Sequence, residues 1–391
     1  MSSYCFFQIL FWIPVGLLFY SYVLYPLFLE LFSLLKLKSQ PLTTNHQPPT
    51  VSILLSVYNE EKVIEEKIKN IFECDYPKDK LEIIIGNDCS NDRTFEILNQ
   101  LTMDNGQLTI CNFEIRRGKP SVLNDLVKKS SGEIILLTDA NILFEKDAIQ
   151  KLVAPFSYSK VGLVGGNILN KASGEGISNQ EKTYITRENR IKFLEGKNFG
   201  SMIGPFGGFY ALRKNLYRDV PENFLVDDFF ICMNVLKQNF KSIAEPGAIA
   251  YEEVSEDWKQ EFKRKARIGA GNFQNLIHFE SLLLRFNATS FCFFSHKVLR
   301  WLGPFFLIGA FLSNIIIVTS FHPYLYLWTM RMQILFFFTP IIMIAEKFLF
   351  RRNISSLNAL PYFYTMNLAL LIGWFRFIKG IKSGVWTPTK R

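Results

Sequence analysis

Two apolar ends bracket a polar middle, and this distribution constrains the fold more than any single motif. Of the 391 residues, 49% are hydrophobic and 20% are charged. The stretch from Phe6 to Leu35 contains one charged residue, Glu30, and is longer than the roughly 20 residues that a spanning helix needs. It lacks the basic start and the small-residue cleavage site of a signal peptide, so we expect a permanent membrane anchor.

Three more apolar stretches follow the polar middle. They run from Val298 to Ser320, from Tyr324 to Phe350 and from Leu357 to Ile378. Lysine and arginine flank the polar middle on both sides, which predicts that it lies in the cytoplasm. Basic residues at 347–352 and 379–391 would also lie in the cytoplasm by the same rule. The single helix between them cannot cross the membrane once and have both ends on one side, so one apolar stretch lies along the interface or a span is miscounted. The segment from Ser295 to Leu302, which mixes basic and apolar residues, is the candidate interfacial helix.

Composition excludes several other classes of protein. The six cysteines and four histidines are too scattered for a zinc site or a disulfide framework, and this pattern is typical of a reducing compartment. The net charge of +9 is explained by lysine and arginine at membrane boundaries. We therefore predict a lipid bilayer, and no nucleic acid, as a partner.

Short apolar runs alternate with helical patterns in the polar middle, after a polar, proline-bearing linker. The predicted strands are Val51–Val57, Leu81–Gly86, Leu108–Phe113, Glu133–Thr138 and Val161–Ile168, and helices are predicted to begin near Glu60, Asp92, Lys119 and Asp147. This alternation predicts an α/β fold with a mostly parallel sheet. Ligands of such sheets bind at the carboxyl ends of the strands.

Polar clusters follow three of the predicted strands. They are Tyr58-Asn59-Glu60, Asn87 to Asp92, and Asp139-Ala140-Asn141. A single cluster of this kind is commonly a helix cap, and Asp92 is expected to be one. Acidic groups on several strand ends would repel one another unless a cation or a ligand lay among them. The pattern therefore predicts a ligand site at this edge of the sheet.

A set of motifs occurs in a fixed order along the chain. The set is Val51 to Glu60, Asn87 to Asp92, Arg117-Gly118-Lys119, Asp139-Ala140-Asn141, Gly207-Gly208, Asp227-Asp228 and Arg264-Lys265-Ala266-Arg267. In this order they resemble family 2 glycosyltransferases, in the membrane-embedded branch that includes cellulose, hyaluronan and poly-N-acetylglucosamine synthases. The resemblance covers roughly residues 51–276. It implies a GT-A domain and a nucleotide-diphosphate sugar donor, with a UDP-sugar expected.

The resemblance also implies a domain organisation. We expect a transmembrane helix over 1–38, a linker over 39–50, a cytoplasmic GT-A domain over 51–285, transmembrane and interfacial helices over 286–380, and a basic cytoplasmic tail over 381–391. The protein would then be a multi-pass protein of the cell membrane. Its acceptor would be a glycan or a lipid-linked molecule at the cytoplasmic face.

Roles for individual residues follow from the resemblance. Donor binding is implied for Tyr58, Asn59, Glu60, Asp88, Lys119, Asp139, Arg264 and Arg267, and contact with the donor sugar or the acceptor for Gly207 and Gly208. A divalent cation, Mg2+ or Mn2+, would neutralise the departing diphosphate, and Asp139 and Asn141 offer it oxygen ligands from one strand end. The acceptor hydroxyl needs a base, and Asp228, beside Asp227 in an apolar setting, is the predicted one.

Structural explanations compete with some of these roles. Asp227 and Asp228 would also complement the dipole of a helix that starts there. Arg264 and Arg267, three residues apart on a predicted helix from Glu261 to Gln274, would also suit anionic lipid headgroups.

The chain departs from the family at two positions. Asn141 stands where the family usually has a second aspartate, and Ile268 stands where processive members have tryptophan. Ile268 favours transfer of a single sugar to a lipid or polyprenyl carrier, whereas Trp386-Thr387-Pro388 resembles the polymerising relatives. Three hypotheses stay open: synthesis of an envelope or extracellular glycan with export or assembly partners, single-sugar transfer, and a catalytically silent scaffolding or binding subunit.

Overall fold

The computed structural model describes residues 3–35, 47–104, 107–170, 177–252, 258–350 and 359–385. The chain divides into two compact units. The first unit comprises Met1–Phe28, Lys259–Phe273 and Phe293–Ile378, and the second comprises Leu29–Trp258, Gln274–Cys292 and Lys379–Arg391. The Trp386-Thr387-Pro388 motif and most of the predicted linker lie outside the described residues.

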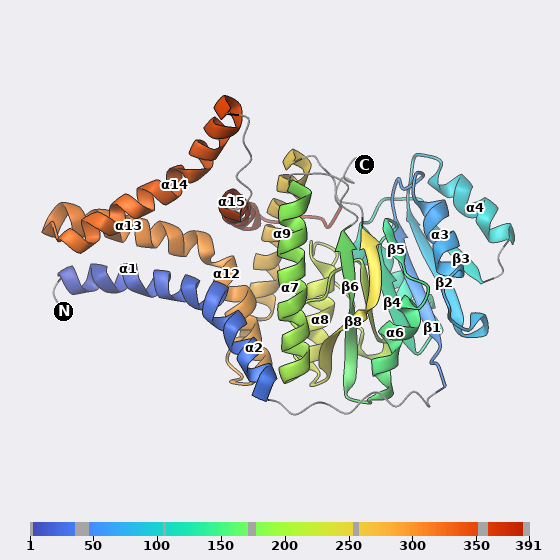
Figure 1. The fold of residues 1–391 in the computed structure, drawn as a ribbon. Helices are drawn as coiled ribbons and strands as arrows, with labels where there is room; N and C mark the ends of the chain where they lie inside the picture. The colour runs from blue at the N-terminus through green and yellow to red at the C-terminus, as the bar shows by residue number, and fades with distance from the viewer. Residues whose placement is uncertain are drawn as a thin grey trace. The chain divides into compact units, whose positions relative to one another are not determined.

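An eight-stranded sheet forms the centre of the second unit, in the order β3-β2-β1-β4-β7-β6-β8-β5 (Figure 1). The strands are β1 Val51–Val57, β2 Leu81–Asp88, β3 Leu108–Phe113, β4 Ile134–Thr138, β5 Ile142–Phe144, β6 Val161–Asn170, β7 Phe209–Arg213 and β8 Lys241–Glu252. Among the described residues, β1, β2, β3 and β4 pair in parallel, as do β6 and β8. The prediction of a mostly parallel sheet is therefore confirmed.

Three strands were not predicted from the sequence. The short β5 follows β4 directly, β7 pairs antiparallel with both β4 and β6, and β8 carries Pro246 and Gly247 inside its span. The register of β6 against β8 shifts between Gly165 and Asn167, opposite this Pro-Gly pair. Proline cannot donate to a ladder, so a strand that contains it needs such an irregularity.

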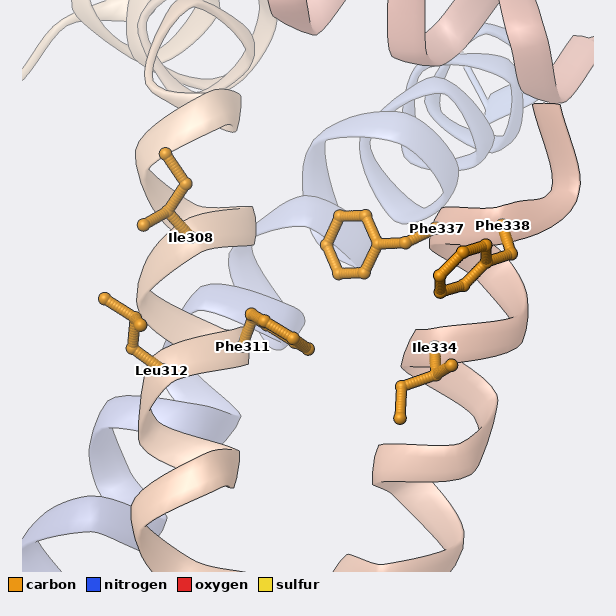
Figure 2. Close-up of a pocket in the computed structure, with 6 residues that line it drawn as sticks. All are labelled: Ile308, Phe311, Leu312, Ile334, Phe337 and Phe338. Carbon is orange, nitrogen blue, oxygen red and sulfur yellow. The ribbon is translucent and has the colours of Figure 1, made fainter. Parts of the chain in front are cut away.

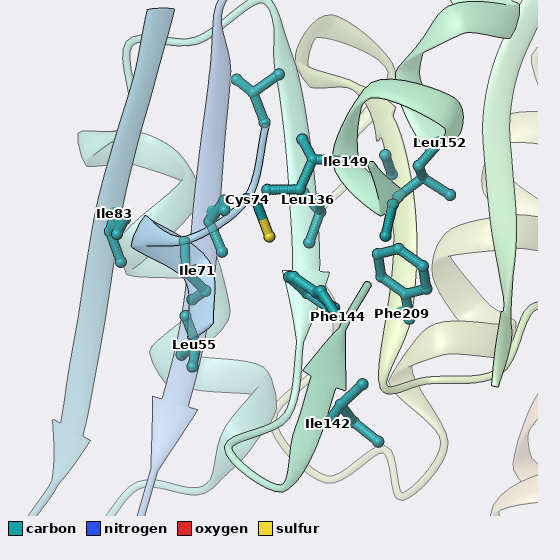
Figure 3. Packing of buried hydrophobic residues seen from close by; sticks show 14 of the residues in the cluster. Leu55, Ile71, Cys74, Ile83, Leu136, Ile142, Phe144, Ile149, Leu152 and Phe209 are labelled. Carbon is teal, nitrogen blue, oxygen red and sulfur yellow. The ribbon is translucent and has the colours of Figure 1, made fainter. Parts of the chain in front are cut away.

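Helices cover both faces of this sheet, and they are α3 Ile64–Phe72, α4 Thr94–Asp104, α5 Lys119–Lys129, α6 Ala148–Val153, α7 Ile177–Phe199 and α8 Asp227–Lys237. The second unit also contains α10 Glu280–Leu283 and α11 Ala288–Cys292, of which α11 contacts α7. Leu55, Leu136 and Phe209 meet Ile149 of α6 in one fully buried apolar cluster (Figure 3). Because side chains of a strand alternate between faces, the other face of the sheet is free to receive α5. These layers hold the carboxyl ends of β1, β2 and β4 in fixed positions.

The first unit is helical. It contains α1 Ser3–Phe19, the π-helix η1 Tyr20–Leu24, the start of α2 Tyr25–Leu35, most of α9 Trp258–His278, the π-helix η5 Phe293–Val298, α12 Leu299–Trp301, α13 Gly303–Phe321, α14 Tyr324–Phe350 and α15 Ala359–Ile378. The α1 helix lies along α13 (Figure 1). The predicted helix from Glu261 to Gln274 lies within α9, and Ser295 to Leu302 falls on η5 and α12.

Within the described residues, two helical segments are long and apolar enough to cross a membrane, Ser3–Leu35 and Gly303–Phe321. The other two predicted stretches are helical as well and form α14 and α15. Between α13 and α14 lies a pocket of about 330 Å³ whose lining is wholly apolar (Figure 2). Such a lining is expected of helices that face lipid. Spanning helices at both ends of the chain remain a prediction.

Candidate active site

The turns that follow β1 and β2 hold each other in place. The Asn59 N–H donates to Ser90 Oγ at 3.0 Å, and Asn59 Oδ1 accepts from the Asn91 N–H at 3.0 Å. Asn59 has a φ of 55°, a left-handed conformation that asparagine tolerates better than most residues. The Glu60 N–H donates to Thr94 Oγ1 at 2.8 Å. The Tyr58-Asn59-Glu60 turn is therefore fixed at the sheet edge, and its predicted contact with the donor remains a prediction.

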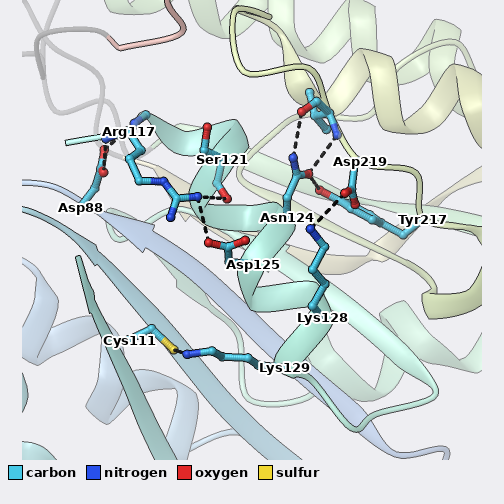
Figure 4. A network of polar contacts seen from close by, with 12 residues as sticks. Asp88, Cys111, Arg117, Ser121, Asn124, Asp125, Lys128, Lys129, Tyr217 and Asp219 are labelled. Carbon is cyan, nitrogen blue, oxygen red and sulfur yellow. Dashed lines mark hydrogen bonds and ion pairs between the residues drawn. The ribbon is translucent and has the colours of Figure 1, made fainter. Parts of the chain in front are cut away.

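Asp88, at the end of β2, is buried and binds the turn that leads into α5 (Figure 4). Its Oδ1 accepts from the Arg117 N–H at 2.7 Å and its Oδ2 from the Gly118 N–H at 2.9 Å. Gly118 has a φ of 87°, which side chains rarely adopt, and Lys119 follows it as the first residue of α5. Asp88 thus fixes the position of Lys119, a role that the sequence did not reveal.

Arg116 is a second residue that sequence reasoning missed. Its guanidinium lies 3.5 Å from the centroid of the Tyr58 ring. An arginine over an aromatic face forms a cation–π contact and presents a flat surface. No sequence signal indicates this pairing, because Tyr58 and Arg116 follow different strands.

Lys119 brings two acidic residues of the predicted site together. Its Nζ lies 2.7 Å from Asp139 Oδ1 and 3.9 Å from Asp227 Oδ2. Burial lowers the pKa of Lys119, but Asp139 and Asp227 outweigh burial, and the pKa ends above its usual value. The lysine therefore stays charged, and it can offer an ammonium group to the phosphates of a donor.

Asp227 and Asp228 begin α8, so the predicted helix start and the predicted site coincide. Asp228 Oδ1 accepts from the Phe229 N–H at 2.8 Å. Burial, and next the charge of Asp227, raise the pKa of Asp228 to about 6. A carboxylate with this pKa is mostly ionised at neutral pH, yet it takes up a proton more readily than an ordinary aspartate.

The two glycines of the Gly207-Gly208 motif allow the loop before β7 to lie close to α8 and to β5. A Cβ at Gly207 would lie 3.0 Å from Asp228 Oδ2, and a Cβ at Gly208 would lie 2.7 Å from a side-chain carbon of Ile142. The Thr138 hydroxyl donates to the Gly208 carbonyl at 2.8 Å. The end of β4, which carries Asp139, is thereby tied to the loop that touches Asp228.

The oxygen atoms of Asp139 and Asn141 at the end of β4 fit a divalent cation whose other ligands come from the phosphates of a bound substrate. Asn141 Nδ2 donates to Glu252 Oε1 at 3.2 Å, so the amide oxygen of Asn141 faces away from that carboxylate. In the described part of the chain, no three His, Cys, Asp or Glu side chains form a complete metal cluster. Mg2+ and Mn2+ sites of nucleotide-dependent enzymes commonly use one or two carboxylates together with substrate phosphates. Asp139, whose side chain is 40% exposed, fits that arrangement, with Asn141 as a weaker ligand.

Arg264 and Arg267 belong to the part of α9 that lies in the first unit. Arg264 Nε and an Nη atom donate to the Glu261 carboxylate at 2.8 and 3.0 Å. Burial would raise the pKa of Glu261, but Lys265 and Arg264 lower it to about 2. Arg264 thus has a carboxylate partner within its own helix, and the predicted contact of both arginines with the donor remains a prediction.

Residues 381–385, predicted to belong to a cytoplasmic tail, pack against the rest of the second unit. The Gly384 N–H donates to the Glu222 carbonyl at 3.0 Å, and Asn223 Nδ2 donates to the Ile381 carbonyl at 3.2 Å. A Cβ at Gly118 would lie 3.2 Å from the Val385 nitrogen. This segment therefore reaches the turn that precedes Lys119.

An α/β sheet with acids at its strand ends, a lysine at the start of α5, a glycine loop and an acidic start of α8 has the arrangement of a GT-A type glycosyltransferase. Residues 52–220 match the family described as "Glycosyl transferase family 2". The chain therefore carries a family 2 glycosyltransferase domain, and it is a glycosyltransferase.

Curated relatives agree with this assignment, and a solved structure shares the fold. The probable glycosyltransferase YdaM of Bacillus subtilis is 29% identical over 294 residues, which cover 70% of this chain and 66% of that protein. A poly-beta-1,6-N-acetyl-D-glucosamine synthase of Staphylococcus epidermidis is 25% identical over 413 residues, which cover 99% of this chain and 97% of that protein. The mannosyltransferase PcManGT from Pyrobaculum calidifontis, solved in complex with GDP-Man and Mn2+, has a TM-score of 0.70 at 20% identity and covers 94% of this chain and 99% of its own. That likeness shows a shared fold.

Proposed function

We propose that this protein transfers a sugar from a UDP-sugar to a growing polysaccharide at the cytoplasmic face of the cell membrane. The observation that carries the proposal is the charge cluster in which Lys119 lies between Asp139 and Asp227, with Asp228 next along α8. Similarity to a polysaccharide synthase along nearly the whole chain supports a polymeric product. The apolar segments Ser3–Leu35 and Gly303–Phe321 support a place in the membrane.

Asp228 acts as the general base of this reaction. The acceptor hydroxyl gives its proton to the Asp228 carboxylate as its oxygen forms a bond to the anomeric carbon of the sugar. The bond between that carbon and the diphosphate oxygen breaks on the opposite side, so the configuration inverts. Gly207 places no side chain against this carboxylate, since a Cβ there would lie 3.0 Å from Asp228 Oδ2.

Lys119 and Asp139 act on the leaving diphosphate. In the free protein each neutralises the other, at a separation of 2.7 Å. A bound diphosphate would offer Lys119 a new anionic partner, and Asp139 would then be able to hold a divalent cation. When bound, the cation supplies positive charge that stabilises the departing diphosphate. Asp88 supports the same step indirectly, because it fixes the turn that positions Lys119.

The experiment that tests this function is donor turnover by the purified full chain in detergent or nanodiscs. The protein is incubated with Mn2+ and with UDP-N-acetylglucosamine, UDP-glucose or GDP-mannose in turn, and released nucleotide and product length are measured. The proposal expects release of UDP from a UDP-sugar together with a ladder of products, and loss of both in Asp228→Asn. No release of nucleotide from any donor, or unchanged release by Asp228→Asn, would overturn it.

One observation favours a second candidate, the transfer of a single sugar to a lipid or polyprenyl carrier. Ile268 stands where processive relatives of the family have an aromatic residue. The same assay separates the two candidates, because a single lipid-soluble adduct without a ladder supports single transfer. A scaffolding subunit would bind donor and release no nucleotide.

A further inference from the structure

Helix α7 has a row of polar side chains on its buried face. Glu188, Lys192, Glu195 and Asn198 are spaced four, three and three residues apart, and each is at most 5% exposed. This spacing places them along one side of the helix. Burial of charged groups costs free energy unless they have partners, so a helix that only covered a sheet would carry apolar residues here. The row therefore has a task beyond packing.

Part of that task is to hold the loop that leads to the Gly207-Gly208 motif. Glu195 Oε2 accepts from the Ile203 N–H at 3.2 Å, just before the loop turns at Gly204. Three residues earlier on α7, Lys192 Nζ lies 3.6 Å from the centroid of the Phe206 ring. Both contacts reach the same side of the loop.

The other side of the loop meets the start of α8. A Cβ at Gly204 would lie 2.9 Å from a ring carbon of Phe229, and a Cβ at Gly207 would lie 3.0 Å from Asp228 Oδ2. Phe206 lies between these glycines. The loop is thus clamped between Lys192 on α7 and the first turn of α8, and Phe206 and Gly207 connect the ammonium to the Asp228 carboxylate.

We propose that Lys192 is a positioning residue for the transfer reaction, because it fixes Phe206, keeps the Gly207 backbone against Asp228, and adds a positive charge that favours the ionised base. The inference rests on the proposed role of Asp228. It assigns a function to a residue that lies outside the motifs of the family and that no sequence pattern singled out.

The charges around Asp228 come from several elements. Burial raises the pKa of Asp228 most, and the charge of Asp227 on α8 raises it further, whereas the Phe229 N–H, Lys119 on α5 and Lys192 on α7 lower it. Tyr210 on β7 also lies near, and burial keeps this phenol neutral by raising its pKa. Loss of the charge at Lys192 therefore raises the pKa of Asp228, so the base becomes protonated at a higher pH.

The test is the pH profile of transfer for Lys192→Met, Lys192→Gln and Lys192→Arg in the full chain. Without the charge, the acidic limb of the pH profile of kcat is expected to move to higher pH by up to about one pH unit, which is the lower end of the effect of an opposite charge in close contact. At pH 6 a move of about one unit corresponds to roughly fivefold slower transfer, with the donor KM unchanged. Lys192→Arg keeps the charge, and its acidic limb is expected to lie at the same pH as that of the unchanged protein.

Lys197→Met is the matched control. Lys197 is on the same helix, and its Nζ bonds Ser33 Oγ at 2.8 Å, so the same change removes a lysine that does not face the loop. An acidic limb that stays in place in both Lys192→Met and Lys192→Gln, or that moves equally in Lys197→Met, would overturn the inference. Unchanged transfer by Asp228→Asn would instead refute the proposed base, and the two failures are therefore distinguishable.

Discussion

Asp228→Asn is expected to abolish transfer and, at neutral pH, to stabilise the fold. Burial and the neighbouring Asp227 raise the pKa of Asp228 from 3.8 to about 6. Between these values the folded protein holds a proton that the unfolded chain has released, so the free energy of unfolding falls as pH rises through this window. This rise in pKa lowers the free energy of unfolding by at most about 3 kcal/mol, and solvent near the partly exposed carboxylate reduces this figure. The loss of stability caused by ionised Asp228 is absent below about pH 4 and complete above about pH 6.

Thermal unfolding in one detergent measures this cost. The Tm of Asp228→Asn should match that of the unchanged protein near pH 4 and exceed it by a few degrees at pH 7.5. Asp219→Asn is the control, because the side chain of Asp219 is 58% exposed and pairs with Lys128 at the surface. A Tm difference that does not vary with pH, or a variant that is less stable at pH 7.5, would refute the argument from burial.

Three further predictions concern the donor side of the site. Asn141→Asp adds a second carboxylate at the end of β4 and is expected to lower the Mn2+ concentration for half-maximal activity, as read from a Mn2+ titration of the rate; an unchanged midpoint would remove Asn141 from the cation site. Lys119→Met removes one charged contact with phosphate and is expected to weaken donor binding by tenfold or more, measured as a Kd for UDP, whereas an unchanged Kd would contradict the role of Lys119. Gly118→Val forces a side chain into a φ of 87° beside Val385 and is expected to cost about 1–2 kcal/mol in chemical denaturation, with Gly309→Ala, where a Cβ meets open space, as the control.

The first half of the sheet is predictable because each of its strands is a short apolar run followed by polar residues. The apolar runs predict the bounds of β1 and β3 to the residue, and those of β2, β4 and β6 within two residues. β1, β2, β4 and β6 lie in the interior of the sheet, where burial of both faces leaves a clear apolar signal, whereas β3 is an edge strand with a partly exposed pattern. The acidic motifs at their ends can therefore be assigned to one edge of the sheet from the sequence alone.

Three strands, β5, β7 and β8, are not predictable from local patterns. The glycine-rich segment before Phe209 hides the start of β7, and the Pro-Gly pair in β8 hides a strand of twelve residues. The contacts of Lys192 and Arg116 join segments that are remote in sequence, so no spacing rule could reveal them. The same reason explains why a nucleotide contact is the expectation for Asp88, whereas its bonds to Arg117 and Gly118 appear only in three dimensions.

The antiparallel pairing of β7 with β4 has a consequence for biosynthesis. It aligns Thr138 with Phe209, which are about 70 residues apart, and it brings the glycine loop to the acid that ends β4. Closing so long a connection lowers the conformational entropy of the chain before the contacts between β4 and β7 can offset the loss. During translation, a nascent chain that has already made the strands and acids of the first half therefore has no reaction centre. The proposed catalytic site is complete only after β7 and α8 have been synthesised and have folded against the earlier strands.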